Sequence, residues 1–302
     1  MARTLDDLAA PRGRAGTWVA GARPRTLAAS LAPVAVGTAA ASTDGHIAWH
    51  RAILALVVAV GIQVGANYAN DAADGARGTD AVRVGPVRLV AAGLATPGRV
   101  RTAAACSAGV GCLAGLALAA ETGWWLLAVG GCCLVAGYCY VGGPRPYGYA
   151  GFGELAAFVF FGPVAVVGTA WVAAAQPHVS GVAAVASVGV GLLAVALLVA
   201  NNLRDRATDA AAGKRTLAVL LGDHRTRAVY AASVVLPAGV AAALAPWHPG
   251  ALLALLALAV AARPLRRVLG GDSGRALVAS LLDTARVQLA YGVLLTLGLA
   301  LS

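Results

Sequence analysis

Long apolar runs recur along nearly the whole chain. Each run is about 17 to 22 residues long, which is the length that an α-helix needs to cross the hydrocarbon core of a bilayer. The sequence is 59% hydrophobic and only 12% charged, so little of it could form a water-soluble core. These features predict an all-α, multi-pass membrane protein.

The apolar runs predict nine transmembrane helices around a central cavity, with the longer loops capping the cavity on the cytoplasmic side. We place the helices at residues 25–41, 50–69, 103–120, 124–141, 154–175, 179–200, 226–245, 247–262 and 281–301. No remaining stretch is long enough for a second domain. Residues 1–302 are therefore expected to form a single integral-membrane domain.

The net charge of +10 would fit nucleic-acid binding, but the positions of the basic residues fit a membrane topology instead. Nearly all of them flank the predicted spans on one side, and only Arg51 falls on the other. Because cytoplasmic loops are enriched in arginine and lysine, we expect a cytoplasmic N-terminus and no nucleic-acid partner. An interfacial aromatic belt is predicted on the opposite side, formed by Trp49, Trp124, Trp125, Trp171 and Trp247.

Two acidic clusters lie at the cytoplasmic ends of predicted spans two and six. They consist of Asn70, Asp71, Asp74 and Asp80, and of Asn201, Asp205 and Asp209. Carboxylates beside a bilayer are costly unless they are compensated, so they indicate function. Magnesium binds one or two carboxylates together with phosphate oxygens of a substrate. The two clusters therefore predict a site for a metal ion and a diphosphate.

The spacing within the clusters fits two facing helices. Asn201, Asp205 and Asp209 follow each other at intervals of four residues, so a continued helix would present all three on one face. Asn70 and Asp74 have the same spacing. The alternative is that these acids only form salt bridges with nearby arginines at a wet interface. The occurrence of two such clusters favours the metal site.

The acidic clusters also suggest an internal repeat. Asp71 and Asp205 are 134 residues apart, with four predicted spans between them. This offset predicts two related halves, at about residues 50–175 and 179–301.

Lys214 is the only lysine in the chain and follows Asp209 by five residues. Its compact ammonium group suits a phosphate oxygen, and Arg215 beside it can donate further hydrogen bonds. The alternative is that Lys214 is an ordinary cytoplasmic-side charge. A Gly- and Pro-rich segment with Tyr140, Arg145 and two further tyrosines could hold an aromatic ring, or its tyrosines could belong to an interfacial belt.

Five stretches of the sequence form a recognisable set. They are ARPRTL (22–27), NYANDAADGARGTD (67–80), RVGPVRLVAAG (83–93), YVGGPRPYGYAGFGELAAFVFFGP (140–163) and NNLRDRATDAAAGKRTLAVLLG (201–222). With them, the chain resembles the UbiA-type intramembrane aromatic prenyltransferases from Trp18 nearly to its C-terminus. The GGPRPYGYAGFGE and GKRTLA stretches are similar to those of the menaquinone branch of that superfamily.

The resemblance implies transfer of a polyprenyl group from polyprenyl diphosphate to 1,4-dihydroxy-2-naphthoate, with loss of CO2 and diphosphate and with Mg²⁺ as cofactor. The implied metal ligands are Asn70, Asp71, Asp74, Asp205 and Asp209, and the four aspartates together with Lys214 are the implied catalytic residues. The expected substrate-binding residues are Asn67, Asn70, Arg77, Arg83, Tyr140, Arg145, Asn201, Asn202 and Arg215. The broader superfamily has a third acid where this chain has Gly78, which leaves the role of Asp80 open.

Several alternatives remain at this point. The nearest is an enzyme of the same superfamily with another acceptor, such as 4-hydroxybenzoate or homogentisate. A CDP-alcohol phosphotransferase would carry a DGxxAR signature, which the sequence DGAR at residues 74–77 does not match. A cation-coupled transporter would place ionisable residues in the middle of its spans, whereas the acids here lie at span ends.

Overall fold

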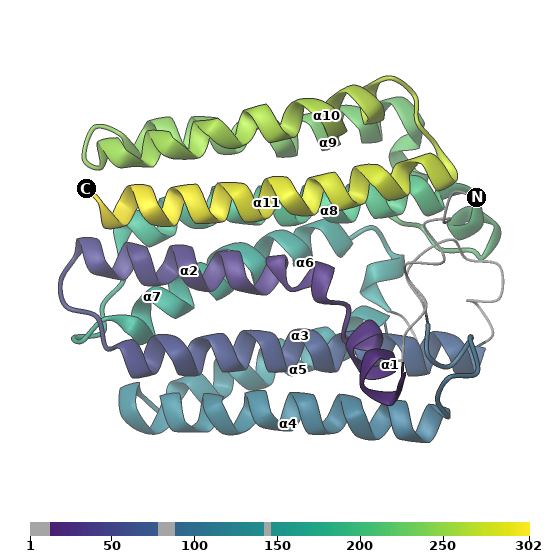
Figure 1. Cartoon of the computed structure of the whole chain (residues 1–302), viewed down its shortest axis with the longest axis horizontal. Coiled ribbons are helices and arrows are strands. Elements are labelled where there is room, and N and C mark those ends of the chain that lie inside the picture. Colours follow the sequence, from purple (N-terminus) through teal and green to yellow (C-terminus); the bar gives the residue numbers. More distant parts are fainter. Residues whose placement is uncertain (1–12, 78–87, 142–145) are drawn as a thin grey trace.

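The structure is a computed structural model that describes residues 13–77, 88–141 and 146–302. Every regular element in these ranges is helical, which confirms the predicted all-α class. Figure 1 shows the long helices running side by side along the longest axis of the molecule. Among the described residues, α11 ends at the opposite end of the bundle from α1.

The α-helices are α1 (Gly13–Ala22), α2 (Ala28–Thr43), α3 (Trp49–Arg77), α4 (Pro97–Thr122), α5 (Trp125–Val141), α6 (Gly153–Val159), α7 (Gly168–Ala173), α8 (Gly181–Ala211), α9 (Leu217–Leu244), α10 (Ala257–Leu269) and α11 (Leu277–Ala300). The 3-10 helices are η1 (Pro24–Thr26), η2 (Tyr147–Tyr149), η4 (Pro249–Leu256) and η5 (Gly274–Ala276). A π-helical segment, η3 (Phe160–Val167), joins α6 to α7.

Six helical segments in the described part of the chain are long and apolar enough to cross a membrane. They are Trp49–Gly75, Pro97–Thr122, Gly153–Ala173, Gly181–Ala211, Leu217–Leu244 and Gly274–Ala300. Two shorter apolar helices cover Ala28–Thr43 and Leu126–Tyr140. The predicted span at 247–262 falls on η4 and the start of α10, where regular α-helix begins only at Ala257. The number of nine spans thus stays a prediction.

Two of the membrane-length segments are irregular, and the sequence explains both. Pro163 lies inside η3, and a proline within a helix lacks an N–H and collides with the carbonyl of the preceding turn. The wider π-helical turn accommodates that collision. In α9, Gly222 has φ of 76° and breaks the helix, a conformation that glycine adopts without the steric cost of a side chain. Predicted span 226–245 begins just after this break.

Helix α8 is the centre of the bundle. In its most apolar window 61% of the residues are buried, against 22% in α4, and it packs against α2, α9, α11 and η3. Small residues allow this enclosure, since a Cβ at Gly162 would lie 2.7 Å from the carbonyl oxygen of Ser187. Close approach through small residues is typical of helix packing in membranes. The packing fixes the end of α8 that carries the second acidic cluster.

The two helices that carry the acidic clusters extend beyond the ends of predicted spans two and six. Helix α3 continues to Arg77, and α8 continues to Ala211 before α9 begins at Leu217. Both acidic clusters are therefore helical as far as they are described. Helix α8 runs past residue 200, where predicted span six ended, because Arg206 and the alanines that follow it are good helix formers. The loop after span two lies partly outside the described residues.

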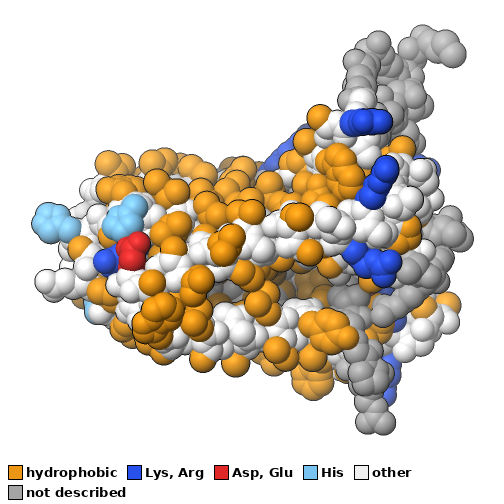
Figure 2. Space-filling model, turned by 90° about the horizontal axis from the view of Figure 1, so that it is seen from below, with side chains coloured by type: hydrophobic (Ala, Val, Ile, Leu, Met, Phe, Trp, Pro, Cys, Tyr) orange, Lys and Arg blue, Asp and Glu red, His pale blue; other side chains and the backbone are white. Residues whose placement is uncertain are grey.

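The surface divides into an apolar band and two polar ends. Figure 2 shows apolar side chains over the middle of the molecule, Lys and Arg at one end, and His with a few charged residues at the other. Trp49, Trp124 and Trp247 are largely exposed, and they lie at the ends of helices away from the acidic clusters. This distribution matches an apolar belt flanked by polar boundaries, as in integral membrane proteins.

The contact between α3 and α4 generates a prediction on stability. A Cβ at Gly61 would lie 2.9 Å from both the backbone nitrogen of Gly111 and the carbonyl oxygen of Ser107. We expect Gly61→Ala to lower the free energy of unfolding by about 1–3 kcal/mol, because the two backbones must separate. Thermal unfolding in detergent measures the effect.

Gly109→Ala in the same helix pair is the matched control. Nothing lies within 4 Å of a Cβ at Gly109, so its stability should be unchanged or slightly raised by the better helix former. Equal stability of the two variants would contradict the close approach of α3 and α4.

Candidate active site

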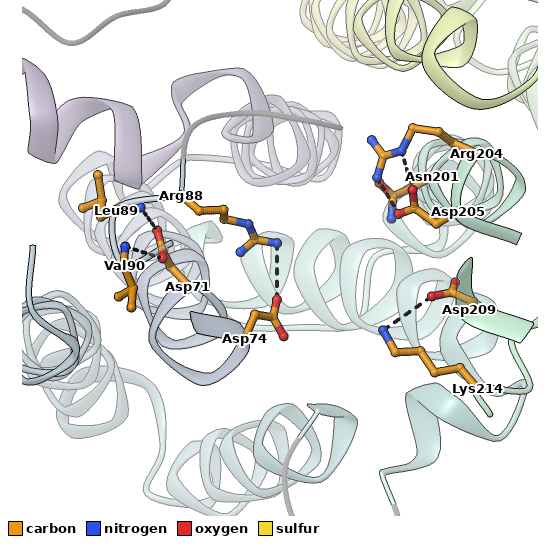
Figure 3. Close-up of polar contacts among 10 residues, drawn as sticks. All are labelled: Asp71, Asp74, Arg88, Leu89, Val90, Asn201, Arg204, Asp205, Asp209 and Lys214. Atoms are coloured by element: carbon orange, nitrogen blue, oxygen red, sulfur yellow. Dashed lines mark hydrogen bonds and ion pairs between the residues drawn. The ribbon is translucent and has the colours of Figure 1, made fainter. Parts of the chain in front are cut away.

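The two acidic clusters lie at the same end of the bundle. Figure 3 shows that Asp74 on α3 and Asp205 and Asp209 on α8 point toward a shared space between the two helices. The described parts of the two predicted clusters are therefore brought together by the fold. Helix α3 supplies one wall of this space and α8 supplies the other.

The side chains of the first cluster have three different environments. Asp71 is completely buried, and its carboxylate accepts hydrogen bonds from the backbone nitrogens of Leu89 (2.7 Å) and Val90 (3.2 Å). Asp74 pairs with the guanidinium of Arg88 at 3.3 Å. Asn70 faces a large pocket. Neighbouring residues of one helix thus have different partners.

The second cluster is held by basic residues. The guanidinium of Arg204 donates two hydrogen bonds to the carboxylate of Asp205, at 2.7 and 2.5 Å, and one to Oδ1 of Asn201 at 2.8 Å. Asp209 is buried and lies 3.4 Å from Nζ of Lys214. The Lys214 ammonium also lies 4.7 Å from the centre of the Tyr149 ring, a cation–π contact that orients it.

A pocket of about 1980 Å³ begins at this end and extends between the helices. Most of its lining is apolar and comes from α2, α3, α4, α5, η3, α8 and α11. The charged side chains among its described lining residues are all arginines, namely Arg23, Arg88, Arg204 and Arg275. Such a pocket suits a ligand with a long apolar tail and an anionic head.

A hydrogen-bond network fixes the turn that carries Arg23. Nδ2 of Asn67 donates to the carbonyl oxygen of Ala22 and to Oγ1 of Thr26, both at 2.9 Å, and the Thr26 hydroxyl donates to the carbonyl oxygen of Arg23. Arg23 has φ of 55°, the only positive φ of a non-glycine residue in the described chain. Asn67 was predicted to bind substrate. Its amide supports the turn, and Asn67 also lines the pocket, so its contact with a substrate stays a prediction.

Tyrosines form the wall beside α8. The rings of Tyr140 and Tyr147 meet edge to face at 5.5 Å, and both line the pocket. Burial raises the pKa of the Tyr147 phenol, with a smaller contribution from Cys139, so its hydroxyl stays protonated at neutral pH and can donate a hydrogen bond. Tyr140, which the sequence predicted to bind substrate, thus lines the pocket, and its contact with a substrate stays a prediction.

Asn202, which the sequence predicted to bind substrate, forms a contact between two helices in the structure. Its amide nitrogen donates to Oε1 of Glu154 at 2.8 Å, and both side chains are buried. The pair joins α8 to α6. Sequence spacing alone could not show this, because Asn201 and Asn202 are neighbours that face about 100° apart on a helix.

Other predicted site residues have varied positions. Arg215 is exposed, and its backbone nitrogen donates to the carbonyl oxygen of Tyr149. Arg83, Arg145 and Asp80, as well as the side chain of Arg77, lie outside the described residues.

The sequence reasoning missed the arginines of the pocket. Arg88 lies within the RVGPVRLVAAG stretch and Arg23 within ARPRTL, so membership in these stretches was a usable signal. Both were counted only as cytoplasmic-side charges. Their positions in the pocket lining depend on how distant segments fold together.

The side-chain oxygens at this site fit a magnesium ion bound between the two helices. Mg²⁺ prefers oxygen ligands, and carboxylate oxygens come from both helices that border the site (Figure 3). The amide side chains of Asn70 and Asn201 line the pocket beside them. Within the described ranges, however, no three His, Cys, Asp or Glu side chains lie close enough to hold a metal ion. A magnesium ion here would therefore take further oxygens from amides, water and the substrate, as is usual for this ion.

Comparison with known proteins defines the class of this bundle and site. Residues 30–279 match the model of the UbiA prenyltransferase family, so the chain belongs to that family. It is an integral membrane protein, as its apolar helices and family membership indicate. The resemblance stated from the motifs is thereby confirmed.

Named relatives cover most of the chain. A 1,4-dihydroxy-2-naphthoate octaprenyltransferase from Mycobacterium tuberculosis is 49% identical over 276 residues, which are 91% of this chain and 94% of the relative. An enzyme of the same name from Escherichia coli is 38% identical over 225 residues, covering 72% of each chain.

Solved structures share the fold. A UbiA homologue from Aeropyrum pernix K1 in its apo state has a TM-score of 0.67 at 17% identity, covering 92% of this chain and 98% of that one. A UbiA homologue from Archaeoglobus fulgidus bound to GPP and Mg²⁺ has a TM-score of 0.58 at 14% identity, with 92% and 99% covered. At these identities the likeness shows the common helical architecture.

The pair of Asn202 and Glu154 generates a second prediction. Asn202→Leu removes the hydrogen bond to a buried carboxylate and should lower the free energy of unfolding by about 1–3 kcal/mol. Glu154→Gln keeps an oxygen that can accept from Asn202 and should cost less. Denaturant unfolding of the three proteins in detergent tests this order. If Glu154→Gln is the less stable variant, the pair is not what joins α8 to α6.

Proposed function

We propose that the chain transfers a polyprenyl group from polyprenyl diphosphate to 1,4-dihydroxy-2-naphthoate, with release of diphosphate and CO2 and formation of the hydroquinone form of demethylmenaquinone. The single observation that carries this proposal is the apolar pocket whose charged lining is arginine and whose mouth lies between two carboxylate-bearing helix ends. The relatives named for the same reaction support it.

The pocket suits both substrates. A polyprenyl tail can lie along the apolar walls, while the arginines at the mouth attract the diphosphate and the acceptor carboxylate. Tyr140 and Tyr147 offer aromatic faces for the naphthoate ring. Water is excluded along the apolar part of the pocket, which protects an allylic cation from hydrolysis.

Magnesium is proposed as the cofactor, held by Asn70, Asp74, Asp205 and Asp209 together with the diphosphate. The Mg²⁺ bound with GPP in the Archaeoglobus fulgidus homologue supports this assignment. When bound, the ion would neutralise charge on the departing diphosphate. Lys214 and the pocket arginines stabilise the same charge from the protein side. The sequence also placed Asp71 among the ligands, but its carboxylate accepts hydrogen bonds from the backbone of Leu89 and Val90.

The reaction needs no general base at the attacked ring carbon, because CO2 rather than a proton leaves from it. The allylic C–O bond breaks with its electron pair going to the diphosphate oxygen, and the ring carbon that bears the carboxylate bonds to the allylic carbon. The bond from the ring to the carboxylate then breaks, CO2 leaves, and its electron pair restores the aromatic ring. No proton has to be removed from the attacked carbon, so the site needs positioning and electrostatic stabilisation above all.

The orientation follows from the charges. The end that is rich in Lys and Arg (Figure 2) is proposed to face the cytoplasm of a bacterial cell, in agreement with the positive-inside tendency. Charged substrates would then enter from the cytoplasm.

Metal removal and loss of the carboxylates test this function. In detergent, EDTA should abolish prenyl transfer, and added Mg²⁺ should restore it. Asp74→Asn and Asp205→Asn should each lower kcat/KM by about 100-fold or more, since each removes charge next to the leaving group. Asp44→Asn is the control, because Asp44 pairs with His178 at the other end of the bundle. Full activity in EDTA, or in both site variants, would remove the proposed metal site.

The acceptor is tested by competition. Given equal amounts of 1,4-dihydroxy-2-naphthoate, 4-hydroxybenzoate and homogentisate, the enzyme should prenylate the naphthoate in large excess, as mass spectrometry of the products would show. Preference for either of the other acids would keep the prenyl transfer and overturn the acceptor.

A further inference from the structure

Both oxygens of the Asp71 carboxylate are bonded to the backbone of another segment. Both of its oxygens accept hydrogen bonds, Oδ2 from Leu89 and Oδ1 from Val90, and the residue has no exposed surface. Figure 3 shows it turned toward these two residues, beside rather than within the space between α3 and α8. A carboxylate that accepts two backbone N–H bonds is a strong anchor for the segment that donates them.

Packing holds the same segment in place from its other sides. Leu89 is completely buried, and a Cβ built on Gly21 would lie 2.6 Å from its Cδ1 atom. On α3, a Cβ at Gly75 would overlap the side chain of Val90. The turn closes with the backbone nitrogens of Leu94 and Ala95 donating to the carbonyl oxygen of Leu89. The segment therefore has one tightly defined position against the end of α3.

Arg88 directly precedes the two anchored residues. Its side chain is 12% exposed and pairs with Asp74, and it lines the large pocket. The anchor at Leu89 and Val90 thus sets where the Arg88 backbone lies, and the backbone position sets how far the guanidinium reaches. Arginine presents planar, paired N–H donors that match phosphate oxygens, so its position matters for recognition of a diphosphate.

We propose that Asp71 is a positioning residue that acts through Arg88: it anchors Leu89 and Val90 so that the Arg88 guanidinium meets the diphosphate of the donor substrate. This inference rests on the proposed function. It replaces the metal-ligand and catalytic roles that the sequence suggested for Asp71. In this arrangement α3 serves the site through two carboxylates with different tasks. Asp74 points to the space between α3 and α8 (Figure 3), and Asp71 holds the segment that carries Arg88.

The experiment separates anchoring from metal binding by measuring ligand binding without metal. The probe is farnesyl thiolodiphosphate, a donor analogue with an unreactive C–S bond, titrated calorimetrically into purified protein in EDTA and again in Mg²⁺. The proteins are wild type, Asp71→Asn, Arg88→Ala, the double variant and Gly75→Ala. Arg225→Ala controls for loss of one positive charge, since Arg225 is exposed on α9.

We expect Asp71→Asn to weaken binding about 10-fold even in EDTA, as is typical when a supporting hydrogen bond of a site is lost. An asparagine would keep one acceptor and turn an N–H donor against a backbone N–H. Gly75→Ala should weaken binding in the same direction, because it displaces Val90 without touching Asp71. In the Arg88→Ala background, Asp71→Asn should add less than about 2-fold, the mark of residues acting as one unit. Arg225→Ala should bind like wild type.

Steady-state kinetics complete the test. Asp71→Asn and Arg88→Ala should both raise KM for the prenyl diphosphate, with KM for the naphthoate and the Mg²⁺ concentration for half-maximal activity near their wild-type values. Melting temperatures in detergent identify any variant that fails to fold, and Gly75→Ala provides a second route to the same displacement.

Three results would overturn the proposal. Wild-type and Asp71→Asn proteins that bind the probe equally in EDTA, while only the variant needs more Mg²⁺, would make Asp71 a metal ligand. Metal-free binding by wild type that is no tighter than by Arg88→Ala would remove the role of Arg88. A raised KM for the naphthoate alone would assign Arg88 to the acceptor carboxylate. The probe binds without an acceptor. The binding results therefore test the role of Asp71 even if the protein proves not to prenylate 1,4-dihydroxy-2-naphthoate.

Discussion

Pairing of charge at the edge of an apolar bundle is the interaction on which the site depends. Carboxylates are costly beside hydrocarbon unless cations or hydrogen-bond donors meet them. Here Asp74 has Arg88, Asp205 has Arg204, Asp209 has Lys214, and Asp71 has two backbone N–H groups. The same cations can turn to substrate oxygens, so the pairs that stabilise the protein also define an anion-binding end.

A rigid frame keeps these pairs in register. Glycines let helices approach at backbone distance, as between α3 and α4 and between η3 and α8, while the large pocket stays open among α2, α4, α5 and α11. Close packing is needed where the acidic helices are held, and space is needed where an apolar tail would lie. The close packing is concentrated around α8, which is enclosed on several sides, and this leaves the space for the pocket elsewhere in the bundle.

Much of the site could be predicted, and the exceptions have one cause. The interval of four between Asn201, Asp205 and Asp209 would place them on one face of a continued helix, and α8 does continue as far as Ala211. Asp71 and Asn202 were grouped with neighbours of similar chemistry, yet each is one residue away from a pocket-facing position and so points about 100° aside. Arg23 and Arg88 escaped notice because their positions depend on distant segments. Asn67, which holds the turn that carries Arg23, bonds to Ala22 across 45 residues of sequence, and Arg88 pairs with Asp74 on α3.

The sequence by itself determined the helical membrane class, the family and the two carboxylate-bearing helix ends, because apolar length, helical spacing and motif order are local properties of a chain. Only the tertiary structure decided which polar side chains face the pocket and which hold the fold. That division depends on burial and on hydrogen bonds between distant segments, such as Asp71 with Leu89 and Asn202 with Glu154. Two carboxylates on one helix can face different partners, one the site and the other the backbone of a distant segment. The spacing of the residues along the helix does not say which partner each carboxylate meets.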